Sequence, residues 1–91
     1  MPGISRVKVD TAGGLINGPG SSDVFVNGSK VSLIGDAVES HSPCPDPVIH
    51  CNATMVQGSS TVFANGIGVV RQGDAASCGH TATGSNDTFA N

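Results

Sequence analysis

The stretch that decides the fold is Asp23-Val-Phe-Val-Asn-Gly28, because it recurs as Thr61-Val-Phe-Ala-Asn-Gly66 at a spacing of 38 residues. The same shift carries Gly35-Asp36 onto Gly73-Asp74. Asn-Gly between two β-type runs is a strong hairpin signal, because both residues tolerate a positive φ angle. We therefore predict two equivalent hairpins. Their apolar return strands are expected at Val31–Ile34 and Val69–Arg71.

A third copy of this unit starts at Gly84-Ser85 and continues to the last residue. A shift of 64 residues aligns Asp10 with Asp74, which places the missing half of this copy near the N-terminus. We predict that Ile4–Asp10 is the return strand of a third hairpin that Asp87–Asn91 begins. One hairpin is marginal alone, but three around a pseudo-threefold axis can bury their Val and Phe side chains against one another.

Length and composition favour one small all-β domain over residues 1–91. Thirteen Gly and five Pro among 91 residues argue against long helices. Only 37% of the residues are hydrophobic, with three Phe and no Trp or Tyr. Because so small a domain buries little apolar surface, we expect a further stabiliser such as a metal, disulfides or a partner.

Charge and hydropathy exclude several classes of function. The net charge is −3, and the sequence has neither a basic patch nor an aromatic platform for nucleic acid. It also lacks an apolar run of membrane-spanning length and a signal-peptide pattern after Met1. We therefore expect a protein that is made in the cytoplasm and that is carried by a machine if it leaves the cell.

All histidines and cysteines lie between residues 41 and 80, a clustering that indicates metal ligation. Gly79 separates Cys78 from His80 and lets both side chains turn towards one centre. His50 and Cys51 are adjacent and point apart on an extended chain, so only one of them is expected to bind. Cys44 lies between two prolines and competes with His50 for a place among the four ligands that zinc usually takes. Spacing alone leaves that choice open.

Three other interpretations of these residues compete with zinc binding. The side chains could be solvated loop residues, or Cys44 and Cys51 could form a local disulfide outside the cell. A Cys–His pair could also be catalytic. Catalysis is disfavoured because a nucleophile needs an orienting acid, an oxyanion hole and a substrate pocket, and a fold of small hairpins has little room for one.

The sequence resembles the PAAR-repeat proteins over nearly the whole chain, from about residue 4 to residue 91. The resemblance rests on the repeated Val-Phe-x-Asn-Gly followed by Gly-Asp, together with Ala75-Ala-Ser-Cys78-Gly-His80 and Thr83-Gly-Ser85. Strict Pro-Ala-Ala-Arg is absent. The corresponding places are Lys30-Val-Ser-Leu33 and Gly68-Val-Val-Arg71, of which one retains the arginine.

This resemblance implies a cone of short β-hairpins with a metal near its vertex. The metal is usually zinc held by three His and one Cys, with iron as an alternative. Carried onto this sequence, the metal ligands are His41, His50, Cys78 and His80, and Cys44 and Cys51 have no family role.

The resemblance also implies a structural, non-enzymatic function. Such caps sharpen the trimeric β-helical spike of a contractile injection machine, with one copy per trimer and transient piercing of the target membrane. We expect a phage tail baseplate, which would place the protein at the tip of the virion. The alternatives are the tip of a VgrG-like type VI secretion spike, delivered from the bacterial cytoplasm, and a small zinc-binding adaptor or effector module carried on the spike.

Overall fold

The computed structural model describes residues 2–41, 44 and 51–91, and in this part of the chain it contains short antiparallel strands and no helix. The strands are β1 (Thr11–Ala12), β2 (Gly14–Gly18), β3 (Phe25–Val26), β4 (Ser29–Lys30), β5 (Ala37–Val38), β6 (Phe63–Ala64) and β7 (Ile67–Gly68). Nothing in these ranges is a helix long and apolar enough to cross a membrane. The predicted all-β class is confirmed.

The two Asn-Gly hairpins form where the sequence predicts them. Both residues of the Asn27-Gly28 turn have positive φ angles, of 52° and 84°, and those of Asn65-Gly66 are 54° and 78°. This is the backbone that a two-residue hairpin turn requires. The strands pair in the same register in both units, with Phe25 opposite Lys30 and Phe63 opposite Gly68.

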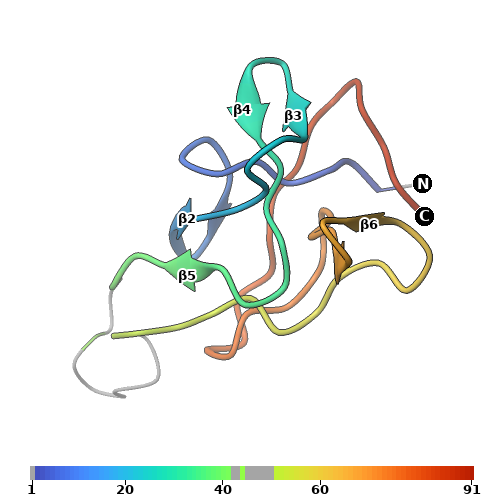
Figure 1. Cartoon of the computed structure of the whole chain (residues 1–91). Helices are drawn as coiled ribbons and strands as arrows, with labels where there is room; N and C mark the ends of the chain where they lie inside the picture. Colours follow the sequence, from blue (N-terminus) through green and yellow to red (C-terminus); the bar gives the residue numbers. More distant parts are fainter. Residues whose placement is uncertain (1, 42–43, 45–50) are drawn as a thin grey trace.

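The two ends of the chain form the third hairpin, as predicted, and lie side by side in Figure 1. Gly3 is bridged to Phe89, and the Ile4 amide donates to the Thr88 carbonyl at 2.8 Å. The predicted return strand, Ile4–Asp10, begins one residue after the start of the observed pairing, which is at Gly3. The first residue opposite Phe89 is Gly3, which therefore corresponds to Lys30 and Gly68 of the other units.

The expected return strands Val31–Ile34 and Val69–Arg71 do not continue the hairpins as regular strands. They and the N-terminal segment instead bridge one another across the pseudo-threefold axis, through the pairs Ile4–Arg71, Arg6–Val31 and Leu33–Val69. Three backbone hydrogen bonds of 2.9 Å close a ring: Ser5 donates to Val70, Val70 to Ser32 and Ser32 to Ser5. Each short segment divides its pairing between two neighbours, so no long ladder can form.

The core lies on both sides of this ring. One buried cluster lies among the hairpins and contains Val26, Val31, Leu33, Ala64, Val69 and Ala90. The other lies among the connectors and contains Ala12, Ile16, Val38, Ala53, Met55, Val70, Ala76, Cys78 and Ala82. The prediction that the phenylalanines join the core is wrong, because Phe25, Phe63 and Phe89 are 52%, 57% and 47% exposed. Successive strand residues face opposite ways, and the residue after each phenylalanine is the one that points inward.

The connectors between the units form a second layer that was not predicted. Strands β1, β2 and β5 make a three-stranded sheet in the order β1-β2-β5. Bridges from Ala37 to Thr54 and from Met55 to Ala76 tie the long connector to this layer and to the loop that follows. We call the end with the three hairpins the base and the end with His41, Cys78 and His80 the apex (Figure 1).

Candidate metal centre

Three of the predicted ligands, His41, Cys78 and His80, meet at the apex. One donor atom from each side chain lies within 4.8 Å of the other two. The His41 Nε2 and Cys78 Sγ atoms are 3.6 Å apart, and the two imidazole rings meet edge to face with centroids 5.0 Å apart. Cys78 is buried at 8% exposure. The fold thus gathers two imidazoles and a thiol from connectors that are distant in sequence.

The orientation of His41 suits a ligand that binds through Nε2. Its Nδ1 atom lies 2.8 Å from the Glu39 carbonyl oxygen, which can only accept a hydrogen bond. Nδ1 therefore carries the proton and donates it, which leaves the Nε2 lone pair directed towards Cys78. A carbonyl behind a ligating imidazole is the usual arrangement that fixes the tautomer in metal sites.

Two glycines make room for these side chains. A Cβ atom on Gly13 would lie 2.4 Å from His80 Cδ2 and 2.8 Å from His41 Nε2. A Cβ atom on Gly14 would lie 2.2 Å from the Glu39 carbonyl oxygen and 2.9 Å from His41 Nδ1. Real Cβ atoms are not found at such distances, so the turn between β1 and β2 must be bare for the cluster to form.

The donor set fits a zinc ion. Zinc bonds of about 2.05 Å to nitrogen and about 2.3 Å to sulfur, at a tetrahedral angle, place the two ligand atoms about 3.6 Å apart. The observed separation of His41 Nε2 and Cys78 Sγ is 3.6 Å. Imidazole and thiolate are also the ligands that structural zinc sites use.

The remaining candidates divide into one outside the described residues and two that are bonded to each other. His50, the fourth predicted ligand, lies outside the described residues. Cys44 and Cys51 form a disulfide, the alternative considered for these two cysteines. Neither of them then offers a thiolate, so Cys44 does not compete with His50 in this structure. Cys78 is the free cysteine of the chain.

Buried aspartates anchor the connectors that carry the site. Asp10 and Asp74 each receive the backbone amide and the guanidinium of an arginine, at 2.8 Å and 2.8 Å from Arg6 and at 2.7 Å and 2.9 Å from Arg71. Burial raises the pKa of Asp10, but hydrogen bonds from Arg6 and from the Thr83 hydroxyl outweigh it, so the pKa lies below its ordinary value. The Asp10 carboxylate is therefore charged at neutral pH, and both aspartates form ion pairs with their arginines.

The sequence pattern missed two features around the site. The Gly13-Gly14 pair could have been identified, because the shift of 64 residues aligns Gly14 with Cys78. A residue without a side chain at this position leaves room for the other connectors to converge. The third PAAR-like segment, Gly3-Ile-Ser-Arg6, was hidden by spacing. Arg6 precedes its aspartate by four residues and Arg71 by three, so a constant shift does not superpose the two segments.

A small all-β body made of three hairpin units, with a His/Cys cluster at one end, defines a metal-binding repeat domain. Residues 8–84 match the family described as PAAR motif, so the chain belongs to that family, which is associated with the tips of injection spikes. It is also 34% identical over 90 residues to "Double-stranded DNA deaminase toxin A" of Burkholderia cenocepacia (strain H111). The matched region is 94% of this chain but only 6% of the length of that toxin.

Proposed function

We propose that the protein is a structural cap on the trimeric β-helical spike of a contractile injection machine, with one copy per spike trimer. The observation that carries the proposal is the closed pseudo-threefold arrangement of a single chain. A ring of three equivalent backbone hydrogen bonds organises three hairpins at the base. One molecule can therefore present three related surfaces to three identical spike chains and still end in a single point.

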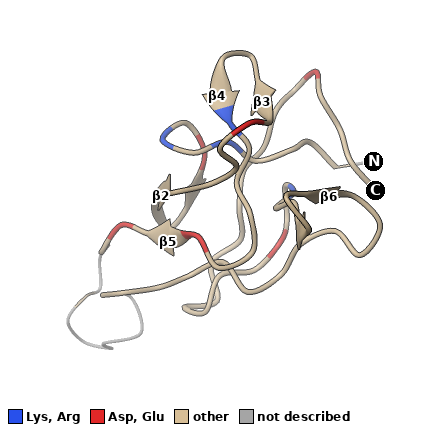
Figure 2. Ribbon diagram, in the orientation of Figure 1, with Lys and Arg blue, Asp and Glu red and all other residues tan. Residues whose placement is uncertain are grey.

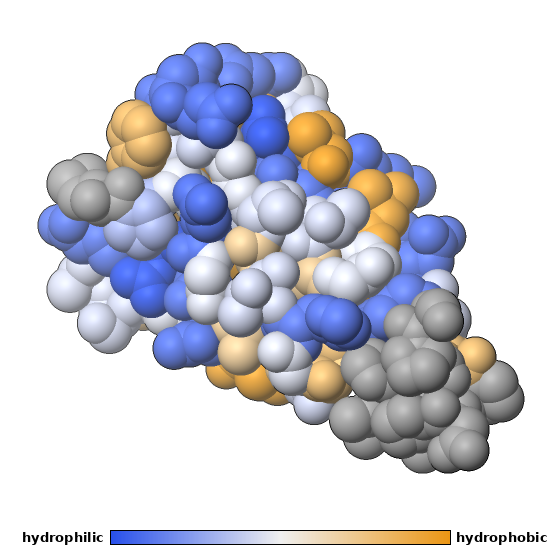
Figure 3. All heavy atoms as spheres, turned by 180° about the vertical axis from the view of Figure 1, so that it is seen from behind, coloured by the Kyte–Doolittle hydropathy of each residue, from blue (hydrophilic) through white to orange (hydrophobic). Residues whose placement is uncertain are grey.

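The phenylalanines of the base suit this docking. Phe25, Phe63 and Phe89 occupy the same position in their units, and each exposes about half of its side chain. Full burial of a large apolar side chain stabilises by about 1.5–3 kcal/mol relative to full exposure. Over the face drawn in Figure 3, apolar residues are scattered among polar ones. One aromatic contact per spike chain would anchor the cap.

A metal at the apex would stiffen the end of the molecule where few residues are available for a core. We propose zinc, with His50 completing the set formed by His41, Cys78 and His80. Apparent binding energies of structural zinc, about 10–16 kcal/mol in zinc-finger peptides, are as large as the whole stability of a typical domain, about 5–15 kcal/mol. The role is structural and not catalytic, because the thiol of Cys78 is buried against two imidazoles.

Native mass spectrometry of the protein mixed with a β-helical spike trimer tests the proposal. The expected species is one cap per trimer. Phe63→Ser should weaken the complex, while Val56→Ser, at an equally exposed position in the long connector, should leave it unchanged. A complex with three caps, or equal effects of the two substitutions, would refute docking through the base.

A second candidate is an adaptor or effector module that travels on the spike. It is favoured by the relative in which the matching segment is a small part of a much longer toxin. We propose the phage baseplate as the setting of the cap and a type VI spike as the alternative. An adaptor would bind the spike without the strict ratio of one to three, so the same mass measurement separates these functions.

A further inference from the structure

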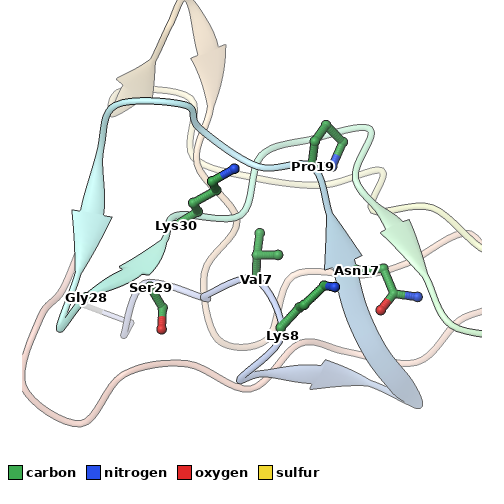
Figure 4. Close-up of a pocket in the computed structure, with 7 residues that line it drawn as sticks. All are labelled: Val7, Lys8, Asn17, Pro19, Gly28, Ser29 and Lys30. Atoms are coloured by element: carbon green, nitrogen blue, oxygen red, sulfur yellow. The ribbon is translucent and has the colours of Figure 1, made fainter.

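Both lysines of the chain line one pocket beside the base. The pocket has a volume of about 360 Å³ and lies between β2 and the β3–β4 hairpin. Figure 4 shows the side chains of Lys8 and Lys30 extending over the same space, with Val7 between them and Asn17 and Pro19 along one side. In a chain of net charge −3, this is a local concentration of positive charge.

The two lysines also break the internal symmetry at the same place. Lys8 lies in the turn before Asp10 at a φ angle of 61°, where the other units have Gly35 and Gly73 at 98° and 91°. Lys30 occupies the position that is Gly68 in the second unit and Gly3 in the third. A long side chain in the left-handed region costs about 1–2 kcal/mol. A lysine at a position where both other units have glycine points to a role for its side chain.

Both ammonium groups are available to a ligand. The two ion pairs found among the described residues use the arginines instead, Arg6 with Asp10 and Arg71 with Asp74. No acidic residue lines the pocket. Figure 2 shows a basic residue at β4 and another in the neighbouring loop on the same side of the molecule. Two unneutralised cations over one cavity form a site for negative charge.

We propose that this pocket binds an acidic peptide segment of a partner protein that is present in a single copy. Its carboxylates would lie between Lys8 and Lys30, in the pocket that Asn17 and Ser29 also line, and an adjacent apolar side chain would pack on Val7 and Pro19. An apolar floor beside two cations suits a peptide better than a bare inorganic anion. Only one unit carries the site, so its partner need not follow the threefold symmetry of the base. This binding is independent of spike capping.

The probe for this site is an acetylated and amidated tripeptide, glutamyl-leucyl-glutamate, titrated into the metal-loaded ¹⁵N-labelled protein. Amide signals of Lys8, Asn17, Ser29 and Lys30 should shift with a dissociation constant of about 1 mM or tighter. Raising the salt concentration should weaken binding, because exposed charges are screened. The matched peptide with glutamine in place of glutamate should cause no shifts.

Lys8→Gly combined with Lys30→Gln should weaken peptide binding at least tenfold and keep the dispersed spectrum of the folded protein. If the double variant does not fold, Lys30→Gln alone, at an exposed position, provides the comparison. Ser60→Asp is the control matched to Lys30→Gln, since each lowers the net charge by one and Ser60 is exposed outside the pocket. The proposal is overturned if inorganic phosphate gives the same shifts as the peptide, if the variants bind normally, or if Ser60→Asp weakens binding equally.

Discussion

At the scale of single residues, the three cysteines have two different roles. Cys78 lies buried beside two imidazoles, whereas Cys44 and Cys51 close a short loop with each other. In the chain-entropy account, a disulfide that closes a loop this short stabilises the fold by about 2.5 kcal/mol, because it lowers the entropy of the unfolded chain. A structural metal contributes considerably more. The sequence counted three cysteines near three histidines but could not separate these roles, because pairing depends on which connectors meet in space.

Substitution of single cysteines tests this division. Cys78→Ala should abolish metal binding and destabilise the fold by at least about 3 kcal/mol, which is a fall in Tm of about 12–24 °C for a domain of this size. Cys51→Ala should retain the metal, and in the presence of a reductant its Tm should match that of the wild type. Elemental analysis and thermal melts measure both effects. Similar losses in the two variants would contradict the proposed metal centre.

Asp10 should make stability depend on pH in acid. Its pKa is lower in the folded protein than in the unfolded chain, where it is about 3.9. The carboxylate therefore stabilises the fold above that value, and this contribution is lost as the pH falls through the folded pKa. Asp10→Asn should destabilise the protein by about 1.5–3 kcal/mol at pH 7, given its charged hydrogen bonds. In denaturant titrations the difference from the wild type should shrink below about pH 4.

At the scale of the elements, three hairpins and the joining of the ends could be predicted from the repeat alone. Asn-Gly turns specify local geometry that the surrounding chain does not alter. The bridges around the axis could not be predicted, because each is a single pair between units that no local pattern encodes. The same holds for β1, β2 and β5, whose pairing depends on how the connectors pack. The exposed phenylalanines were misassigned because alternation gives two faces but does not say which one is inside.

A circular permutant tests the hairpin formed by the ends. The chain is opened at Asn65-Gly66, and a short glycine linker joins residue 91 to residue 1. Because Gly3 and Phe89 are already paired, the permutant should fold, bind one metal and give a circular dichroism spectrum like that of the parent. Opening the chain at Ser32 instead should prevent folding, since this cut interrupts the ring of axial hydrogen bonds. Equal behaviour of the two permutants would mean that the ring is dispensable.

At the scale of the whole molecule, the base and the apex have separable stabilities. The base has its own buried cluster, while the apex cluster includes Cys78, a proposed ligand. Loss of the metal should therefore loosen the connectors before the hairpins. The family could be recognised from sequence because its motifs are local, but the way a bare glycine turn admits the two imidazoles is a property of the folded body.

Removal of the metal by a chelator tests this division between base and apex. Amide hydrogen exchange should speed up first at Ala53, Met55 and Ala76 in the apex cluster, while Val31 and Val69 in the base remain protected. The measurement is hydrogen exchange followed by NMR before and after chelation, with the metal added back as a control. A uniform rise in exchange across both clusters would show that the molecule unfolds as one unit.

The pairing of Gly3 with Phe89 also constrains how the protein is made. A ribosome releases the chain from its N-terminus, so the N-terminal half of the third hairpin emerges long before the half that completes it. Residues 2–4 cannot make their pairing with residues 88–90 until those have left the exit tunnel, whatever the other two hairpins have done by then. The axial ring does not depend on them, because Ser5, Ser32 and Val70 all leave the exit tunnel before residues 88–90. The third hairpin therefore cannot close until residue 90 has left the exit tunnel, and a nascent chain stalled before that point would hold two hairpins and an open seam.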